Sequence, residues 1–307
     1  MRLIRTVLLL SLLAAAVTVG GATAAQAKLA VGIADNKSDM FTDPRFTALK
    51  VRYVRVMVPY DAMHDFAQRT WLDGWMAGAK ADGLTPLVTF DRSRKRTSHN
   101  PSAAQMATSL KDVRKRYPFV KEFATWNEAN INKRPETVAR WWLAMRKACP
   151  TCTILGADLL DRNNVGTWAQ RFTKAAKRTP KVWGLHNYTD ANTLKTVGTR
   201  KLLKAVKGAV WFTETGGVVS RNNGSGIAFP TGATHAAKAT KFVFSTLAKL
   251  SPRVQRAYLY HWNTGLGDIT TAVDDDDRTW DSGLIGPDDK PRPSLAVLQT
   301  LLGVRAS

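Results

Sequence analysis

A short apolar run ends in two polar residues at Val120–Glu128, whose sequence is VKEFATWNE. Apart from Lys121 and Glu122 near its start, the run is too apolar for a strand that faces water on either side. A strand of this kind is typical of a parallel sheet covered by helices on both faces. The pair Asn127-Glu128 then stands at the carboxyl end of the strand, where parallel sheets carry their ligand-binding side chains.

Seven further runs of this type recur along the chain, at Leu29–Ala34, Tyr53–Pro59, Thr85–Phe90, Thr153–Ala157, Val182–His186, Val210–Thr213 and Arg256–Trp262. Amphipathic stretches separate them, and their apolar spacing predicts helices. These helices are expected at Thr70–Ala81, Ser102–Tyr117, Val138–Ala148, Trp168–Lys177, Leu194–Val206, Ala233–Leu250 and Leu295–Leu302.

The alternation of strand and helix predicts the fold class. No linker rich in Pro, Gly or Ser interrupts the series, so residues 28–307 are expected to form one domain. Eight strand–helix units favour an α/β fold with a single closed (β/α)8 TIM barrel over an open doubly wound sheet. The chain lacks a G-x-G-x-x-G turn and a P-loop, so neither nucleotide binding nor any other cofactor is predicted.

The first 27 residues have the pattern of an export signal. Arg2 and Arg5 precede the apolar run Val7–Val19, and Ala25-Gln26-Ala27 has the small-x-small pattern that a signal peptidase accepts. Cleavage after Ala27 is expected, because the apolar run is shorter than the roughly 20 residues that a membrane span needs. The mature protein is therefore predicted to be secreted, with no membrane insertion.

The cysteines Cys149 and Cys152 are separated by two residues. An exported protein meets oxidising conditions, so a short disulfide between them is the expected state. A redox dithiol should follow a strand and open a helix, whereas this pair closes a predicted helix and precedes a strand. A structural zinc site would need two further ligands, and no metal is predicted.

The formal net charge is +21, and the predicted signal peptide contributes only Arg2 and Arg5 to it. A basic surface attracts polyanions. Arg92–Arg96, RSRKR, lies in a predicted strand-to-helix loop, which would suit an anionic polysaccharide or retention on an acidic cell envelope. Other cationic groups, such as Arg114–Arg116, lie on predicted helices, so a solvated basic shell is the alternative. No nucleic-acid recognition motif is present, and a monomer is expected.

Two glutamates directly follow strongly apolar strands: Glu128, and Glu214 after the run VWFT. They close the fourth and seventh predicted strands, which lie nearly opposite each other in an eight-stranded ring. Glycosidic cleavage needs one carboxylic acid that protonates the leaving oxygen and one carboxylate that attacks the anomeric carbon or stabilises its positive charge. Each Glu could instead pair with a Lys or Arg, but the positions of this pair favour catalysis.

The chain resembles the retaining glycoside hydrolases of clan A, whose barrels carry the acid/base after strand four and the nucleophile after strand seven. Trp126-Asn127-Glu128 is similar to the Asn-Glu motif of the clan, although Ala129 follows where the clan usually has proline. The segment 212–216, FTETG, is similar to the strand-seven motif. WDSGL at 280–284, followed by KPRP at 290–293, resembles family 39-like and family 5-like members.

The resemblance implies roles for individual residues. Glu128 would be the acid/base and Glu214 the nucleophile. Asn127 would bind the 2-hydroxyl of the sugar, and Arg55 would act on Glu214 through its charge.

Other strand-end residues complete the predicted site. By the same resemblance, His186 and Tyr188 would hydrogen-bond near the two carboxylates. Trp262 would offer a flat face to the sugar ring, although a tryptophan that ends a buried strand can also fill the core. Asp35 and Asp91 close the first and third strands, so we expect them to contact the substrate.

These features together predict a secreted retaining glycoside hydrolase. It would cleave a polysaccharide or oligosaccharide by double displacement. The alternative from another class of protein is a catalytically silent barrel that binds carbohydrate or an anionic polymer of the cell envelope.

Overall fold

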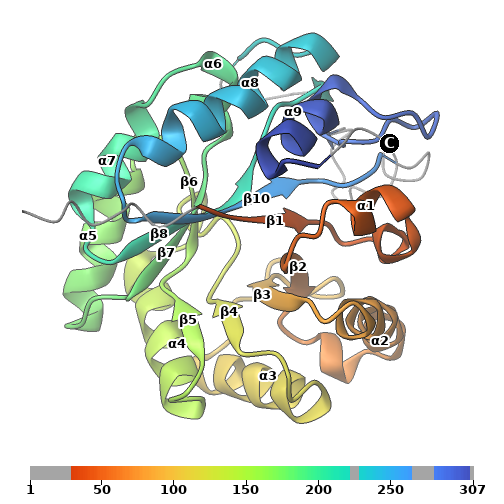
Figure 1. The fold of residues 1–307 in the computed structure, drawn as a ribbon. Coiled ribbons are helices and arrows are strands. Elements are labelled where there is room, and N and C mark those ends of the chain that lie inside the picture. The colour runs from red at the N-terminus through yellow and green to blue at the C-terminus, as the bar shows by residue number, and fades with distance from the viewer. Residues whose placement is uncertain (1–28, 222–227, 265–279, 305–307) are drawn as a thin grey trace, which may run out of the picture.

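Parallel strands close into a barrel that helices surround in chain order (Figure 1). The computed structural model describes residues 29–221, 228–264 and 280–304. The predicted signal peptide, residues 1–27, lies outside the described residues. The barrel segments are β1 (Ala30–Ala34), β2 (Tyr53–Pro59), β3 (Thr85–Asp91), β4 (Glu122–Ala124), β5 (Thr153–Leu155), β6 (Asp158–Leu160), β7 (Val182–His186), β8 (Ala209–Thr215) and β10 (Val254–Tyr260).

The fifth barrel strand is divided into β5 and β6. β5 pairs with β4, whereas β6 pairs with β7. Backbone hydrogen bonds link the two parts to both neighbours, from Asp158 N to Trp126 O and from Gly156 N to Val182 O, each at 3.0 Å. Because β1 pairs with both β2 and β10, the ring is closed, which confirms the predicted (β/α)8 barrel.

The outer helices are α1 (Pro44–Ala48), α2 (Phe66–Ala81), α3 (Ala103–Arg116), α4 (Pro135–Ala148), α5 (Val165–Ala176), α6 (Tyr188–Thr193), α7 (Val197–Ala205), α8 (Ala233–Ser245) and α9 (Pro293–Leu302). Local sequence explains their first residues. Ser102 and Gln105 form a reciprocal capping box at the start of α3, and Pro135 and Pro293 occupy the first positions of α4 and α9. A two-stranded antiparallel sheet, β9 (Ser220–Arg221) with β11 (Trp280–Asp281), lies outside the barrel.

The helix predicted at Leu194–Val206 is α7, which begins three residues later than predicted because Leu194 has a positive φ of 54° and caps α6. The chain then starts again as α7 at Val197, with two backbone N–H groups of its first turn bonded to Asp190. The apolar spacing therefore predicted α7, and the left-handed turn at Leu194 accounts for its later start.

The core has two parts. A small cluster fills the inside of the barrel, formed by Ala34, Leu87, Ala124, Leu155, Val182, Trp211 and Tyr258. A larger one lies between the barrel and the helices and includes the fully buried rings of Trp75, Trp141 and Trp142. Apolar side chains therefore fill the barrel and the space under the helices, and polar side chains occupy the carboxyl ends of the strands.

Two further findings concern the predicted export. Cys149 and Cys152 form the expected disulfide between the end of α4 and the start of β5. Across residues 29–221, 228–264 and 280–304, every helix is too short or too polar to cross a bilayer.

Candidate active site

A β-bulge directs Glu214 into the barrel mouth. On β7, Gly184 and His186 are two residues apart, but their partners on β8, Trp211 and Glu214, are three apart. The extra residue on β8 interrupts the simple alternation of its side chains. As a result, two consecutive side chains of β8 lie on the inner side of the barrel. Thr213 contacts Asp158, and Glu214 pairs with Arg55.

Glu128 lies just beyond the end of β4, in a strained backbone conformation. Its φ is +44°, which is uncommon for a residue with a side chain. The residues on either side are held by backbone hydrogen bonds, from Asn127 N to Phe90 O at 2.8 Å and from Ala129 N to Asp158 O at 3.0 Å. Neighbouring strands thus hold Glu128 in a geometry of a kind that clusters at functional sites.

The two glutamates face each other across His186. Ligand atoms of Glu128, His186 and Glu214 all lie within 4.8 Å of one another. The Glu128 side chain is 27% exposed and that of Glu214 is 10% exposed, so both border solvent. The predicted pair therefore meets in one pocket at the carboxyl ends of the strands.

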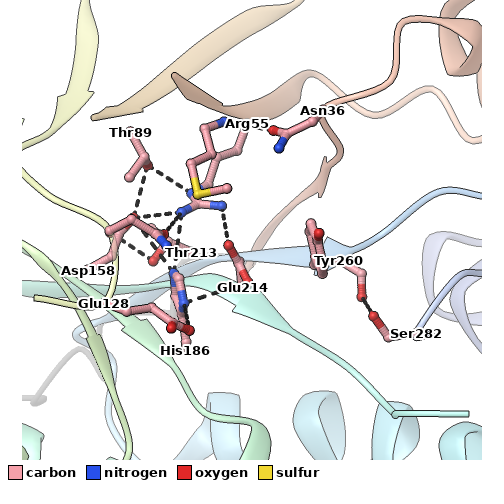
Figure 2. Close-up of polar contacts among 12 residues, drawn as sticks. Asn36, Arg55, Thr89, Glu128, Asp158, His186, Thr213, Glu214, Tyr260 and Ser282 are labelled. Atoms are coloured by element: carbon pink, nitrogen blue, oxygen red, sulfur yellow. Dashed lines mark hydrogen bonds and ion pairs between the residues drawn. The ribbon is translucent and has the colours of Figure 1, made fainter. Parts of the chain in front are cut away.

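Arg55 is buried and connects most of the site (Figure 2). Its Nη1 donates to Glu214 Oε1 at 2.6 Å, and its Nη2 donates to Asp158 Oδ2 at 2.9 Å and to Asn127 Oδ1 at 3.0 Å. Its Nε donates to Thr89 Oγ1 at 2.9 Å. Because the guanidinium is buried and fully engaged, it holds both carboxylates and the amide in place.

Asp158 is fully buried beneath the glutamates. Burial opposes its ionisation, but the charge of Arg55 and a hydrogen bond with His186 outweigh it and lower the pKa of Asp158 to about 2. Thr89 and Thr213 donate their hydroxyls to its two oxygens, each at 2.9 Å. Asp158 is therefore a permanent negative charge below the site.

His186 lies among three carboxylates. Its Nδ1 is 3.0 Å from Glu128 Oε1 and 3.6 Å from Glu214 Oε2, and its Nε2 is 3.7 Å from Asp158 Oδ2. Burial lowers its pKa, but the charge of Glu214 and the hydrogen bonds with Asp158 and Glu128 prevail and raise the pKa to about 9. The neighbouring carboxylates, when ionised, therefore favour the protonated imidazole.

The same three residues could ligate a metal ion, since one imidazole and two carboxylates converge there. Two observations make a divalent ion a poor fit. Arg55 already pairs with Glu214, and a metal would require His186 in its neutral form, against its raised pKa. These residues therefore suit a cluster in which the charges of Arg55 and His186 offset those of the carboxylates.

Aromatic side chains border Glu214. The hydroxyl of Tyr188 donates to Glu214 Oε2 at 3.1 Å, and burial together with the charge of Glu214 raises the pKa of Tyr188, which keeps it protonated. The ring of Trp280 contacts Tyr188 edge-on at 4.7 Å between centroids. Tyr260, at the end of β10, is half-buried and also lies on this side (Figure 2).

Trp262 does not lie in the pocket, which corrects its predicted role as a sugar platform. Its side chain is completely buried, packs edge-on against Phe46 at 5.5 Å and donates from Nε1 to Asp43. Strand alternation no longer applies beyond Tyr260, where β10 ends. Trp262 therefore belongs to the core, and Tyr260 is the aromatic residue of β10 at the mouth.

Asp35 is also not placed to contact substrate. It is buried, and its oxygens accept hydrogen bonds from Trp262 N and from the backbone and side chain of Lys37. Burial opposes its ionisation, but the charge of Lys37 and a hydrogen bond with His261 lower its pKa to about 2. Asp35 fastens the loop after β1 to the end of β10, which corrects the predicted contact.

The other predicted residues are brought together. Arg55, Asn127, His186 and Tyr188 contact the glutamates or one another. Asp91 ends β3, and in the described part of the chain no hydrogen bond or ion pair joins it to the glutamates. The sequence reasoning did not assign Thr89 and Tyr260 to the site, counted Asp158 among the polar residues that close strands without giving it a role, and left Trp280 between core and pocket. Inward alternation along β3 (Leu87, Thr89) and β10 (Tyr258, Tyr260) was the signal that could have identified two of them.

The fold defines the chain as a TIM barrel, and solved structures with a similar fold include glycoside hydrolases. Xylanase 10B from Thermotoga maritima has a TM-score of 0.60 at 12% identity, covering 91% of this chain and 96% of the xylanase. A β-1,4-mannanase of family 113 has a TM-score of 0.55 at 17% identity, covering 91% and 99%. An endo-β-1,3-glucanase of family 128 from Amycolatopsis mediterranei has a TM-score of 0.57 at 14% identity, covering 88% and 98%.

These likenesses confirm the fold. Comparison with protein-family models gives no match, and comparison with curated protein sequences gives none either. The family 39-like and family 5-like features stay predictions.

Proposed function

We propose that the protein is a retaining glycoside hydrolase. The observation that carries this proposal is the approach of Glu128 and Glu214, from opposite sides of the barrel, with carboxylate oxygens less than 4.8 Å apart. Retaining enzymes hold their two carboxyl groups about 5–5.5 Å apart, whereas inverting enzymes need about 6.5–9.5 Å to admit a water molecule. The short separation supports a covalent double displacement.

The surroundings of the two glutamates differ, and the difference supports their assigned roles. Glu214 accepts hydrogen bonds from Arg55 and Tyr188, which suit an ionised nucleophile held in one position. Glu128 is the more exposed side chain, and its partner is His186. Greater access to water suits the residue that must give up a proton and later take one back.

In the proposed first step, Glu214 attacks the anomeric carbon while Glu128 gives its proton to the glycosidic oxygen, so the leaving sugar departs as an alcohol. In the second step, ionised Glu128 takes a proton from water, and the resulting hydroxyl displaces Glu214 from the sugar. Asn127, which Arg55 orients, would bind the 2-hydroxyl. Tyr260 and Trp280 would contact the apolar face of the sugar in place of Trp262.

The test uses Glu128→Gln and Glu214→Gln on a panel of polysaccharides that includes xylan, mannan, β-1,3-glucan and uronic-acid polymers. Each variant is expected to lower kcat/KM by at least about 10³-fold, because one half of the mechanism is lost. Nuclear magnetic resonance of the first product released by the wild type should show the anomeric configuration of the substrate. Inverted product would refute the double displacement.

Glu136→Gln is the matched control, because Glu136 lies on the outer helix α4 and pairs with Arg171. It makes the same chemical change and should leave activity at the wild-type level. A wild type that binds a glycan of the panel but cleaves none would replace the hydrolase with the silent carbohydrate-binding barrel.

We also propose that the protein is exported as a monomer, with cleavage after Ala27, and acts on a polysaccharide or oligosaccharide outside the cytosol. The basic and apolar segments of residues 1–27 support export, and the disulfide Cys149–Cys152 suits an oxidising compartment. Amino-terminal sequencing of protein recovered from culture medium should begin at Lys28. Retention of residues 1–27 would contradict the proposal.

A further inference from the structure

Cations surround the amino-terminal end of the barrel, which is the end opposite the two glutamates. Four of them stand directly before β2, β4, β7 and β10: Arg52, Lys121, Lys181 and Arg253. The backbone carbonyl of each accepts a hydrogen bond, at 2.8–2.9 Å, from a residue at the start of a neighbouring strand. Because the strands are parallel and the ring is closed, all four residues lie at one end of the barrel.

The other segments that join helices to strands add to this charge. Five more exposed cations lie in those that lead into β2, β7, β8 and β10: Lys50, Lys177, Arg178, Lys207 and Lys249. We call the nine residues the basic face. One acid, Asp82, lies in the helix-to-strand segments, and within residues 29–221, 228–264 and 280–304 no ion pair joins an acid to any cation of the basic face.

At the opposite end, acids of the chain offset some of the cations. Arg45 Nη2 is 2.8 Å from Asp43 Oδ2, and Lys95 Nζ is 2.6 Å from Asp65 Oδ2. Both pairs include a residue of a strand-to-helix loop, so they lie toward the end that holds the glutamates. The charge of the basic face is not offset in this way, and it is available to an anionic partner.

An apolar groove lies within the basic face. Its volume is about 680 Å³, and its apolar lining includes Phe244 and Leu301, the latter 40% exposed. Lys50, Arg52 and Lys249 line the same groove. Apolar and cationic side chains therefore meet in one hollow. Such a lining is complementary to an amphiphile, in which an anionic group is joined to a hydrocarbon chain.

We propose that the basic face docks the protein on a surface of anionic phospholipids, with the groove against the lipid. The cations are spread around the ring of strands and not along a line, which suits a two-dimensional array of headgroups. Lysines and arginines near such a surface each add to the affinity. The groove favours lipid over a polyanion that has no apolar part. Docking by this end leaves the glutamates facing away from the lipid, and the inference does not depend on the hydrolase activity.

The test is co-sedimentation of the protein, purified from the culture, with vesicles of phosphatidylglycerol or of phosphatidylcholine. The wild type should bind phosphatidylglycerol at least about tenfold more tightly at low salt and lose this preference at high salt. A variant that combines Lys121→Gln, Lys181→Gln and Lys207→Gln should bind phosphatidylglycerol about 100-fold more weakly, because three charges are lost. Changing the same three residues to arginine should keep the binding.

The matched control combines Arg134→Gln, Arg162→Gln and Lys195→Gln. It removes three exposed charges from loops at the end that holds the glutamates, and it should keep the binding. An equal loss in both triple variants would overturn the inference, because the attraction would then be spread over the whole surface. Absence of wild-type binding to phosphatidylglycerol at low salt would also overturn it.

Soluble polyphosphate separates a lipid surface from a linear polyanion, since it carries phosphate charges without an apolar part. The wild type should bind the vesicles more tightly than polyphosphate when affinities are compared per accessible phosphate at equal ionic strength. Tighter binding of polyphosphate would overturn the docking on lipid and assign the basic face to a linear polymer.

Discussion

Gly184 on β7 shows how closely single residues are constrained beneath the site. A Cβ at this position would lie 1.9 Å from Asp158 Oδ1 and 2.7 Å from Thr213 Oγ1. Both atoms belong to the buried network that connects Arg55 to the glutamates. Only glycine leaves room for the Asp158 carboxylate.

Gly184→Ala is therefore expected to displace Asp158, to lower the free energy of unfolding by about 2–3 kcal/mol and to lower activity by at least about tenfold. Chemical denaturation and kcat/KM check the two effects. Gly74→Ala is the control, because Gly74 lies in α2 and a Cβ added there would meet nothing within 4 Å. That variant should gain roughly 0.5–1 kcal/mol from helix propensity, and an equal response of both glycines would contradict the account.

Residue types and their positions after strands were sufficient to predict much of the site. Glu128, Glu214, Arg55 and His186 follow or lie within apolar runs, and the structure brings them together. Trp262 was misassigned because the direction of a side chain beyond the last paired residue depends on how the chain turns. The role of Asp35 could not be predicted either, since its partners Lys37 and Trp262 meet only in the folded chain.

Among the elements, the short helix α6 is held by a buried acid. Asp161, just beyond β6, accepts hydrogen bonds from Thr189 N at 3.3 Å and Asp190 N at 2.6 Å, next to Tyr188. Burial raises the pKa of Asp161 to about 7. The hydrogen bond that Asp161 accepts from the Asp190 N–H acts to lower this pKa, and the negative charge of Asp190 acts to raise it. The fold thus favours the protonated form of Asp161.

A pH dependence of stability follows. A carboxyl group with a raised pKa contributes full stability below its unfolded pKa, near 3.8, and loses it as pH rises through about 7. Asp161→Asn removes this titration, so the decline in unfolding free energy between pH 4 and pH 7 should shrink by on the order of 3 kcal/mol. Denaturant titrations at several pH values measure the slope, and identical slopes for variant and wild type would rule out the effect. The variant loses one hydrogen-bond acceptor at every pH, which lowers stability without changing the slope.

The sequence predicted the bounds of several strands and helices closely. Tyr53–Pro59 and Val182–His186 have the predicted bounds, and the capping signals placed α3 and α4 within a few residues. The division of the fifth strand and the bulge on β8 were not predicted. Both depend on pairing with neighbouring strands, which the local sequence does not report.

Across the whole barrel, an ion pair joins opposite strands at the end away from the active site. Arg256 of β10 donates to Glu122 of β4 at 2.5 Å, and its guanidinium lies 3.7 Å from the ring of Tyr53 and 3.8 Å from the ring of Trp211. Both charged side chains are largely buried. The pair closes the floor of the barrel below the apolar layer.

Glu122→Gln should therefore lower the free energy of unfolding by about 2–4 kcal/mol, because it leaves the Arg256 charge buried without a counter-charge. Activity per folded molecule should stay at the wild-type level, since Glu122 and Glu128 lie at opposite ends of β4. Thermal unfolding and active-site-normalised kinetics measure both. The control Glu136→Gln, whose side chain is half-buried and whose partner Arg171 is exposed, should change stability less. A loss of activity without a loss of stability in Glu122→Gln would contradict this separation of the barrel floor from the active site.

The sequence by itself determined the eight strand–helix units and which acids and cations stand at the carboxyl ends of strands, because apolar periodicity and polar interruptions are local properties. Only the tertiary structure decided that Asp158 lies next to His186 and that Trp262 is buried in the core. These relations join residues far apart in the chain. Their geometry follows from strand register, the bulge on β8 and loop packing, which exist only once the barrel closes.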